Sequence, residues 1–308
     1  MFYILYYICY YKFMNKQSPY YTFAQYIRKN FNTKAFRVSI DASFGCRENC
    51  IYCEEHYRKP SDESIKKQID KLIPYLKSRY KAKDFYLYFQ KGTNTDADPE
   101  KLKKIYDSAL SYRDFLGFIV GTRPDYMDKE KVEVINSYTD KYDTWIEYGL
   151  QSANNKTLKL INRNHTYEDF LKALQLTEGT DIKITVHLIL GLPGEKSEDM
   201  INTVKKISKL PIKGVKFHHL YILKDTPLYK MYKKGNYTPI DYETYKKVLM
   251  ESLQYLDKEV VVHRIMGEDY SDRFVGPKWN MSKNYIINDI KKSMIKKNYY
   301  QGKKHNRR

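Results

Sequence analysis

Cysteine is scarce in this chain, and long apolar runs are missing. Four cysteines occur in 308 residues, and three of them lie together between positions 46 and 53. Cysteines this few and this clustered exclude a secreted scaffold held together by disulfides, so we expect a reduced, cytoplasmic location. The most apolar stretch, MFYILYYICYYKFM at the start, is shorter than the roughly 20 residues that a membrane-spanning helix needs. We therefore expect no membrane span.

The start also lacks the features of a secretion signal, which are a basic first segment and a cleavage site of small residues. Met14-Asn15-Lys16 looks like an ordinary beginning, so we interpret residues 1–13, with Cys9, as a gene-calling artefact rather than an interfacial anchor. No linker rich in Gly, Ser or Pro divides the remainder. We expect an N-terminal extension over residues 1–35, a core domain over 36–240, and C-terminal helices and a strand with a basic tail over 241–308.

Acidic residues are outnumbered by basic ones, 37 to 55, which gives a formal net charge of +18. Such an excess suits an anionic partner such as a nucleic acid. The lysines are spread along the chain, however, and accompany 32 Tyr with abundant Asn and Ile, a mixture that codon drift in an A/T-biased genome produces. Nucleic acid thus stays a partner that no motif supports. The one dense basic run, residues 291–308, is expected to be a frayed, solvated end.

From residue 36 onward, short apolar runs alternate with stretches of helical period. The expected strands are 38–40, 85–89, 115–120, 145–150, 182–190 and 214–222, and the expected helices between them are 64–80, 99–111, 129–138, 167–177 and 197–209. A further helix at 242–256, a strand at 260–265 and a helix at 283–296 follow. This alternation predicts an α/β fold with parallel strands. We expect a partial (β/α)6 TIM-type barrel with a small C-terminal extension, although periodicity alone also allows a doubly wound sheet.

The clustered cysteines directly follow the first expected strand. Cys46, Cys50 and Cys53 lie on one loop, where three thiolates can converge on a soft metal centre. One possibility is an iron-sulfur cluster with one iron left without a protein ligand. Another is a closed zinc site with His56 as the fourth ligand, and a third is no metal site. The spacing does not decide among them.

This spacing, with Tyr52 directly before the last cysteine, resembles the radical S-adenosylmethionine (SAM) superfamily. The resemblance implies that Cys46, Cys50 and Cys53 hold a [4Fe-4S] cluster whose open iron chelates SAM, with the Tyr52 ring beside the adenine. One electron, from a donor of the flavodoxin or ferredoxin type, would then cleave SAM and give a 5′-deoxyadenosyl radical. That radical would abstract hydrogen from a substrate that the sequence does not reveal.

Later strand ends carry further parts of the resemblance. Gly92 and Thr93 lie where the family usually has a Gly-Gly-Glu-like turn, so the resemblance places them at the methionyl group of SAM. The texts Gly121-Thr-Arg-Pro-Asp125 and Glu147-Tyr-Gly-Leu-Gln-Ser152 resemble the elongator-like and coproporphyrinogen-dehydrogenase-like branch. In the coproporphyrinogen-dehydrogenase-like enzymes, a Gln and an Arg at the positions of Gln151 and Arg163 contact the cofactor.

The fifth strand ends in His187-Leu-Ile-Leu-Gly-Leu-Pro-Gly-Glu195. By resemblance, Leu190 and Gly191 flank the adenine, while His187 stands where the branch has an acidic residue. Together with Gln90-Lys-Gly-Thr-Asn-Thr95 and Lys216-Phe-His-His-Leu-Tyr221, these texts resemble the YhcC-type radical SAM family over about residues 20–302. That family usually has a longer insert between its first two cysteines.

Candidate residues for the substrate side are His219, Tyr221 and His263, each of which can also be an ordinary packed strand residue. Among enzymes, a tRNA-modifying or a tetrapyrrole-related radical SAM enzyme stays open. Outside enzymes, the alternative is a zinc-stabilised RNA-binding protein without catalysis.

Overall fold

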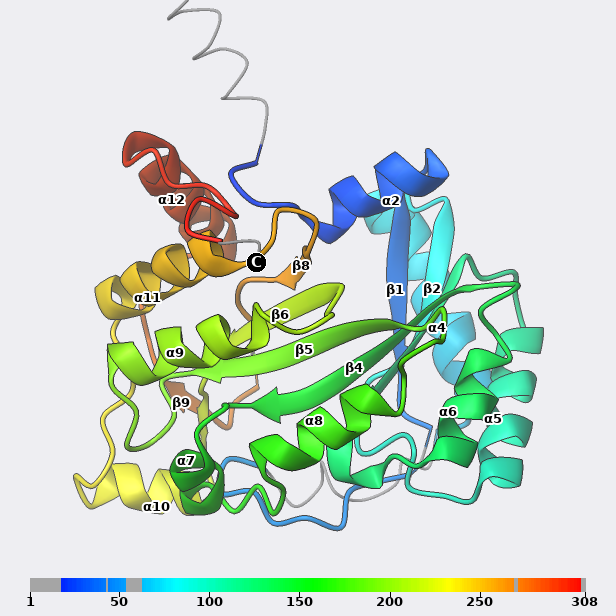
Figure 1. Ribbon diagram of the computed structural model, residues 1–308, viewed down its shortest axis with the longest axis horizontal. Helices are drawn as coiled ribbons and strands as arrows, with labels where there is room; N and C mark the ends of the chain where they lie inside the picture. Colours follow the sequence, from blue (N-terminus) through cyan, green and yellow to red (C-terminus); the bar gives the residue numbers. More distant parts are fainter. Residues whose placement is uncertain (1–17, 43, 54–62, 269–270, 306–308) are drawn as a thin grey trace, which may run out of the picture.

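The computed structural model describes residues 18–42, 44–53, 63–268 and 271–305. Its centre is a parallel sheet of seven strands in the order β1-β2-β3-β4-β5-β6-β8 (Figure 1). The strands are β1 (Ala35–Ile40), β2 (Asp84–Phe89), β3 (Gly117–Thr122), β4 (Asp143–Gln151), β5 (Lys183–Leu190), β6 (Gly214–His219) and β8 (Val261–Arg264). The expected strands are therefore confirmed, except that the one expected over 214–222 ends at His219, and the strand near residue 260 completes the same sheet.

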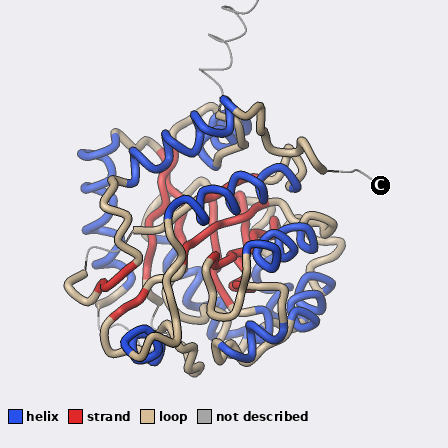
Figure 2. The backbone as a smooth tube through the Cα atoms, turned by 90° about the vertical axis from the view of Figure 1, so that its left-hand side faces the viewer, coloured by secondary structure: helices blue, strands red, loops and turns tan. Residues whose placement is uncertain are grey.

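The strand order decides between the two expected architectures. Each strand pairs in parallel with the one before it, from β1 to β6, and β8 follows β6. A doubly wound sheet would reverse its order at a switch point, whereas an order that runs one way under right-handed crossovers keeps the helices on one face. Figure 2 shows the helices around the outside of the strands. The fold is the predicted partial barrel, whose edge strands are β1 and β8.

The connecting helices lie where the pattern predicts them. They are α4 (Ile65–Tyr80), α5 (Pro99–Ser111), α6 (Lys129–Asn136), α8 (Tyr167–Gln175), α9 (Ser197–Ile207), α11 (Tyr242–Tyr255) and α12 (Lys283–Lys296). Sequence patterning did not predict α2 (Phe23–Phe31), η1 (Pro124–Tyr126), α7 (Asn155–Leu160) and α10 (Pro227–Lys233). Helix α2 nevertheless starts with a capping box formed by Thr22 and Gln25, a signal that the sequence contains.

Alternating residues of each strand face the helices or the interior of the half-barrel. Toward the helices, buried apolar side chains such as Leu87, Val120 and Ile146 form the main core. Toward the interior, Tyr86 and Trp145 pack with Phe23 of helix α2 at the N-terminal ends of the strands. Helix α2 thus closes one end of the interior, and the polar interior residues lie nearer to the C-terminal strand ends.

The expected strand over 214–222 is interrupted. Strand β6 ends at His219, and β7 (Ile222–Leu223) instead pairs antiparallel with β9 (Phe274–Gly276) in a separate two-stranded sheet. The sequence stays apolar across the break, so periodicity could not show that the chain leaves the main sheet there and pairs with β9. Leu220 and Tyr221, between β6 and β7, belong to neither strand, and Tyr221 lines a cavity at the C-terminal strand ends.

The expectation of a frayed basic end is wrong for residues 291–305. Met294 of α12 is fully buried, and the Gln301 side chain donates to the carbonyls of Asp257 and Val260. The Lys304 backbone N–H donates to the Gln254 carbonyl. These buried anchors hold the segment although its lysines face solvent. Within the described ranges, no helix combines the length and apolar character needed to cross a bilayer.

Candidate functional site

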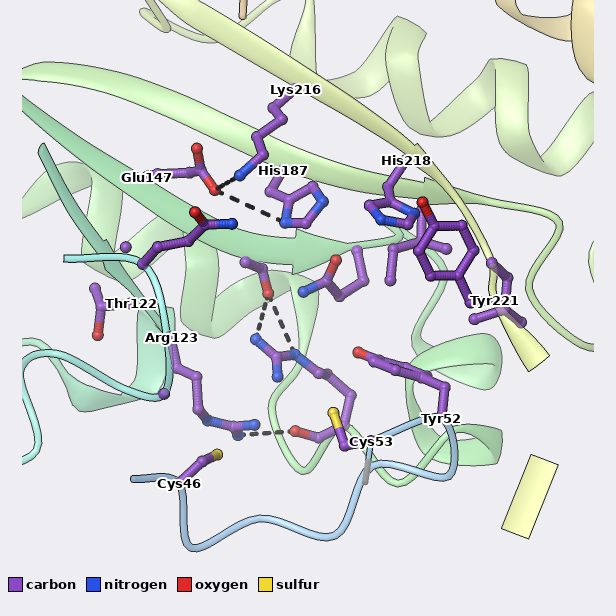
Figure 3. Close-up of a pocket in the computed structure, with 18 of the residues that line it drawn as sticks. Cys46, Tyr52, Cys53, Thr122, Arg123, Glu147, His187, Lys216, His218 and Tyr221 are labelled. Atoms are coloured by element: carbon purple, nitrogen blue, oxygen red, sulfur yellow. Dashed lines mark hydrogen bonds and ion pairs between the residues drawn. The ribbon is translucent and has the colours of Figure 1, made fainter. Parts of the chain in front are cut away.

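A cavity of about 370 Å³ opens at the C-terminal ends of the barrel strands. It brings together residues that are far apart in the sequence and that Figure 3 shows around one space. Its lining includes Cys46, Tyr52, Cys53, Gly92, Thr93, Arg123, Glu147, Gln151, Arg163, His187, Lys216, His218, His219, Tyr221 and Arg264. Most of the residues singled out from the sequence therefore share one cavity.

The cysteine loop is docked on the end of β2 through a backbone contact. The Thr93 N–H donates to the Gly45 carbonyl at 2.7 Å. Gly92 has a φ of +80°, and a Cβ on it would lie 2.2 Å from the Gly45 oxygen. Only glycine combines this backbone conformation with so close an approach. The turn expected to bind the cofactor therefore also positions the residue directly before Cys46.

Two further contacts hold the middle of the loop. The Ile51 N–H donates to the Ile161 carbonyl at 3.1 Å, and the Ile51 carbonyl accepts from the Leu228 N–H at 2.9 Å. The Thr93 hydroxyl lies 3.4 Å from the Cys46 sulfur. Ile161 caps the C-terminal end of α7, and Leu228 lies in the first turn of α10. These two helices, which the sequence pattern did not predict, thus support the cysteine loop.

Arg163 joins strand β4 to the cysteine loop. Its Nη2 and Nε donate to the Gly149 carbonyl at 2.6 and 3.2 Å, and its Nη1 lies 3.6 Å from the Cys50 sulfur. A Cβ on Gly149 would meet Arg163 Nη2 at 2.7 Å, so the lack of a side chain at Gly149 makes room for the guanidinium. Arg163 brings a permanent positive charge beside the thiols.

This environment shifts the pKa values of the Cys50 and Cys53 thiols in opposite directions. The hydrogen bond from Cys53 and the charge of Arg163 lower the pKa of Cys50 to about 5 against the effect of burial. The same hydrogen bond, together with burial, raises the pKa of the Cys53 thiol. Among the described residues, no group of three or more His, Cys, Asp or Glu side chains is close enough to hold a metal ion. His56, the expected fourth zinc ligand, lies outside the described residues.

Several buried polar atoms of this cavity have no hydrogen-bond partner among the described residues. They include Gln151 Oε1, His187 Nε2 and the Tyr52 hydroxyl oxygen. Gln151 has a φ of +72° and lies where the pairing of β4 with β5 shifts register, which turns it away from the regular strand. Burying a polar atom without a partner costs free energy. These atoms are therefore suited to contact a bound polar ligand.

Arg123 is a site residue that the sequence reasoning named only as part of a motif. Its Nη2 donates to the Arg163 carbonyl at 2.8 Å and to Asp125 Oδ2 at 2.7 Å, and its side chain is only 3% exposed. It therefore fixes the segment that carries Arg163. An arginine directly after an apolar strand was the available signal.

The interior below the cysteine loop contains a buried charged pair that the sequence reasoning did not find. Lys216 Nζ lies 2.7 Å from Glu147 Oε1, and Tyr88 donates to the same oxygen at 2.7 Å. Burial lowers the pKa of Lys216 to about 8, against the effect of Glu147. Burial alone would raise the pKa of Glu147, but Lys216 and Tyr88 together hold it below its usual value. The available signal in the sequence was a charged residue inside a largely apolar strand, Glu147 in β4 and Lys216 in β6.

The remaining candidates fall into two groups. His219 and Tyr221 line the cavity. His263 is not among its lining residues: it is bonded to Arg37 and Thr185 and packs against Trp145 on the closed side of the interior.

Leu190 and Gly191 also lie outside the lining, whereas their neighbour Ile189 is part of it. Leu190 is buried in the main core. The Gly191 carbonyl accepts from the Tyr237 hydroxyl at 2.7 Å. Side-chain parity explains the difference between Leu190 and Ile189, because alternate residues of β5 face the helices.

The residues present fit an iron-sulfur cluster and SAM. Three thiols lie on one loop, two of them lining the cavity, and thiolates are the usual ligands of such clusters. A hydroxyl and a guanidinium contact two of the sulfurs, as donors around cluster sulfurs do. The partnerless Gln151 oxygen faces the same cavity.

Known proteins resemble this chain over most of its length. The sequence profile of the Radical SAM superfamily matches residues 40–207, and that of the Radical SAM C-terminal domain matches residues 212–296. An uncharacterised protein of Methanocaldococcus jannaschii is 37% identical over 301 residues, which cover 92% of each chain. Protein YhcC of Escherichia coli is 28% identical over 262 residues, covering 82% of this chain and 85% of that protein.

The solved structure of the archaeal Methanocaldococcus infernus Elp3 superposes with a TM-score of 0.69 at 22% identity, covering 87% of this chain and 64% of that one. It shows the same fold. The predicted resemblance is thereby confirmed, and with it the enzyme class. The chain belongs to the radical SAM superfamily, whose members use a [4Fe-4S] cluster and S-adenosylmethionine, and it is a radical SAM enzyme.

Proposed function

We propose that this radical SAM enzyme holds its cluster on Cys46, Cys50 and Cys53 and binds SAM across the cavity toward Gln151 and Arg163. The observation that carries the proposal is the docking of the thiol loop. Gly92 and Thr93 fix its start, and Arg163 lies beside Cys50. A structural zinc loop would not need an open cavity on its inner side.

Cys46, Cys50 and Cys53 would hold the cluster, which would supply the electron for the reductive cleavage of SAM and so the radical chemistry of the superfamily. The chain's own residues bind and orient the reactants. Arg163 offers a positive charge and remaining donors to a carboxylate. The Gln151 oxygen, which has no partner among the described residues, accepts from a ribose hydroxyl or an amine. The Tyr52 ring covers the cavity from the cysteine loop.

The part of the cavity beyond SAM is where the substrate binds. His218, His219 and Tyr221 at the end of β6 border it on one side. His187 and the Glu147–Lys216 pair lie deeper along the same sheet, with the His187 ring 5.9 Å from that of His218. His219 and Tyr221 thus keep their expected role on the substrate side, and His187 and His218 join them. His263 does not line the cavity, so it can influence the substrate only through the lining residues in front of it.

Members of this superfamily require a reductant. We assign this role to a small acidic electron carrier of the flavodoxin or ferredoxin type, because a net charge of +18 favours association with an acidic protein. Arg47, next to the first cysteine, has a side chain that is 75% exposed. It lies where such a carrier would approach the cluster.

The test is anaerobic reconstitution of wild type and of Cys46→Ala, Cys50→Ala and Cys53→Ala, with Cys9→Ala as the matched control outside the motif. Wild type and Cys9→Ala are expected to bind about four irons per chain and to release 5′-deoxyadenosine after addition of SAM and dithionite. Each motif variant is expected to lose both. Stoichiometric zinc with salt-sensitive RNA binding and no nucleoside would instead support the zinc-stabilised RNA-binding protein.

A further inference from the structure

The cavity has two positively charged ends. Arg123 and Arg163 form the first, beside the thiols. Lys216 of β6 and Arg264 of β8 form the second, deeper in the interior. His187 lies beside the second end, because it is the β5 partner of Lys216 and its Nδ1 is 3.9 Å from Glu147 Oε1. The first end serves the thiolates and SAM, so the second end needs another explanation.

Arg264 differs from the other cations that line the cavity. Arg163 donates to Gly149, Arg123 to Asp125, and Lys216 to Glu147. Arg123 also has two buried nitrogens without a partner among the described residues, Nε and Nη1, but its Nη2 is bonded to Asp125. Arg264 has a buried Nε without a partner, and its guanidinium forms no hydrogen bond or ion pair with the residues that the structure describes. A guanidinium carries five N–H donors and stays charged at any physiological pH. A half-buried arginine without such a partner is costly unless a ligand supplies the acceptors.

The acids of the cavity do not balance this charge. Glu147 is already engaged by Lys216 and Tyr88. Glu268, the other acid of the lining, forms an ion pair with Lys283 at 3.0 Å. The histidines neither add to this charge nor offset it, because burial holds the pKa of His187 and His218 well below the usual value and so favours their neutral form. The deep end therefore keeps an excess of positive charge.

The space around Arg264 has room for a ligand group. Arg264 and Lys216 also line a second hollow of about 340 Å³, which includes Arg37 and Ser39 of β1. Strands β1 and β8 are the two edges of the sheet, so this hollow lies at the seam of the half-barrel. Gln90, Lys216 and Arg264 line both hollows. Arg37 lines only the second one, where it is turned toward His263 and stacks on Phe23.

We infer that the substrate carries an oxyanion group, a carboxylate or a phosphate, and that Arg264 binds it with support from Lys216. This inference rests on the proposed function, which makes the cavity a substrate site. Arg264 pairs with two oxygens of the group, as guanidinium does with both kinds of oxyanion. The anion is thereby fixed at the deep end, and the rest of the substrate extends toward the SAM end.

The test measures binding of two probes, inorganic phosphate and succinate, to the full chain at constant ionic strength by NMR chemical-shift titration. Arg264→Gln is compared with Arg264→Lys and with Arg113→Gln, a surface arginine paired with Asp70. Wild type and Arg113→Gln are expected to bind at least one probe equally well. Arg264→Gln should weaken that binding about 10- to 100-fold, the effect of losing a charge-assisted pair. The probe that binds more tightly identifies the group as phosphate or carboxylate.

Arg264→Lys keeps the positive charge and is the control for the possibility that Arg264→Gln fails to fold. It should weaken binding less than Arg264→Gln, because it loses only the paired geometry. Equal affinity in wild type and Arg264→Gln, or no binding of either probe by wild type below about 10 mM, would overturn the inference. SAM cleavage by wild type without anion binding refutes this inference alone. Anion binding without SAM cleavage refutes the proposed function alone.

Discussion

Replacing Gly92 by Ala tests whether the backbone contact at the end of β2 positions the cysteine loop. Gly179→Ala is a matched control, because Gly179 has a φ of +77° against +80° at Gly92 and its Cβ would meet nothing within 4 Å. Both variants carry the strain of a left-handed alanine, about 1–2 kcal/mol. Any further effect of Gly92→Ala comes from its surroundings.

The size of that further effect follows from the contact. The alanine Cβ would lie 2.2 Å from the Gly45 oxygen, whereas ordinary contact starts at 3.4 Å, so the two must move apart by about 1 Å. The hydrogen bond from Thr93 to Gly45 would be lost, which costs about 0.5–1.5 kcal/mol, and overpacking costs about 1–3 kcal/mol. We expect Gly92→Ala to be about 2–4 kcal/mol less stable than Gly179→Ala.

Urea denaturation of the metal-free variants measures the stability difference, and iron content after reconstitution measures the effect on the site. A metal site tolerates shifts of about 0.2 Å, so Gly92→Ala should bind less than about one iron per chain where Gly179→Ala binds about four. Equal stability and equal iron content in the two variants would refute the reasoning.

Three further predictions concern other parts of the site. Glu147→Gln leaves Lys216 buried without its counter-charge and should cost about 3–5 kcal/mol in urea denaturation, while the Glu147→Gln, Lys216→Met double variant should recover most of this; no recovery would speak against the pair. Burial first, and then Arg264, lower the pKa of His219 from 6.5 to about 3, so its stabilising effect is present above pH 6.5 and is lost as the pH falls. From pH 7.5 to 5.5 it should cost about 1.4 kcal/mol, and His219→Phe should remove that part of the pH dependence; an unchanged slope would contradict the assignment. Gly149→Ala, whose Cβ would lie 2.7 Å from Arg163 Nη2, should weaken SAM binding about tenfold or more in equilibrium dialysis, and unchanged affinity would separate Arg163 from the cofactor.

Local apolar patterning was enough to predict most of the fold. The parallel strands and their helices are visible in the sequence because each buries one face or one stripe. What the pattern could not show is which partner a segment finds. The run from Gly214 to Leu223 looks continuous, yet its end leaves β6 to pair with Phe274–Gly276. The basic run after Lys291 looked solvated because its few buried residues, Met294 and Gln301, are hidden among lysines.

The site was predictable where a motif required a special residue. The loop of Cys46 and the turn at Gly92, each singled out by its motif, are in contact in the structure. The association of Lys216 with Arg264 at the deep end was not predicted, because only the closure of the sheet places these two strand residues together. Likewise, the parity of β5, which buries Leu190 against the helices and leaves Ile189 in the lining, depends on register rather than on composition.

Electron paramagnetic resonance of the reconstituted, dithionite-reduced protein, with and without SAM, tests the central claim most directly. The account predicts a reduced [4Fe-4S] signal in wild type and Cys9→Ala whose g values shift when SAM is added, because SAM reaches the iron that lacks a protein ligand. Cys50→Ala should show no such signal. A wild-type signal that SAM leaves unchanged, or the same SAM-sensitive signal in Cys50→Ala, would contradict the account.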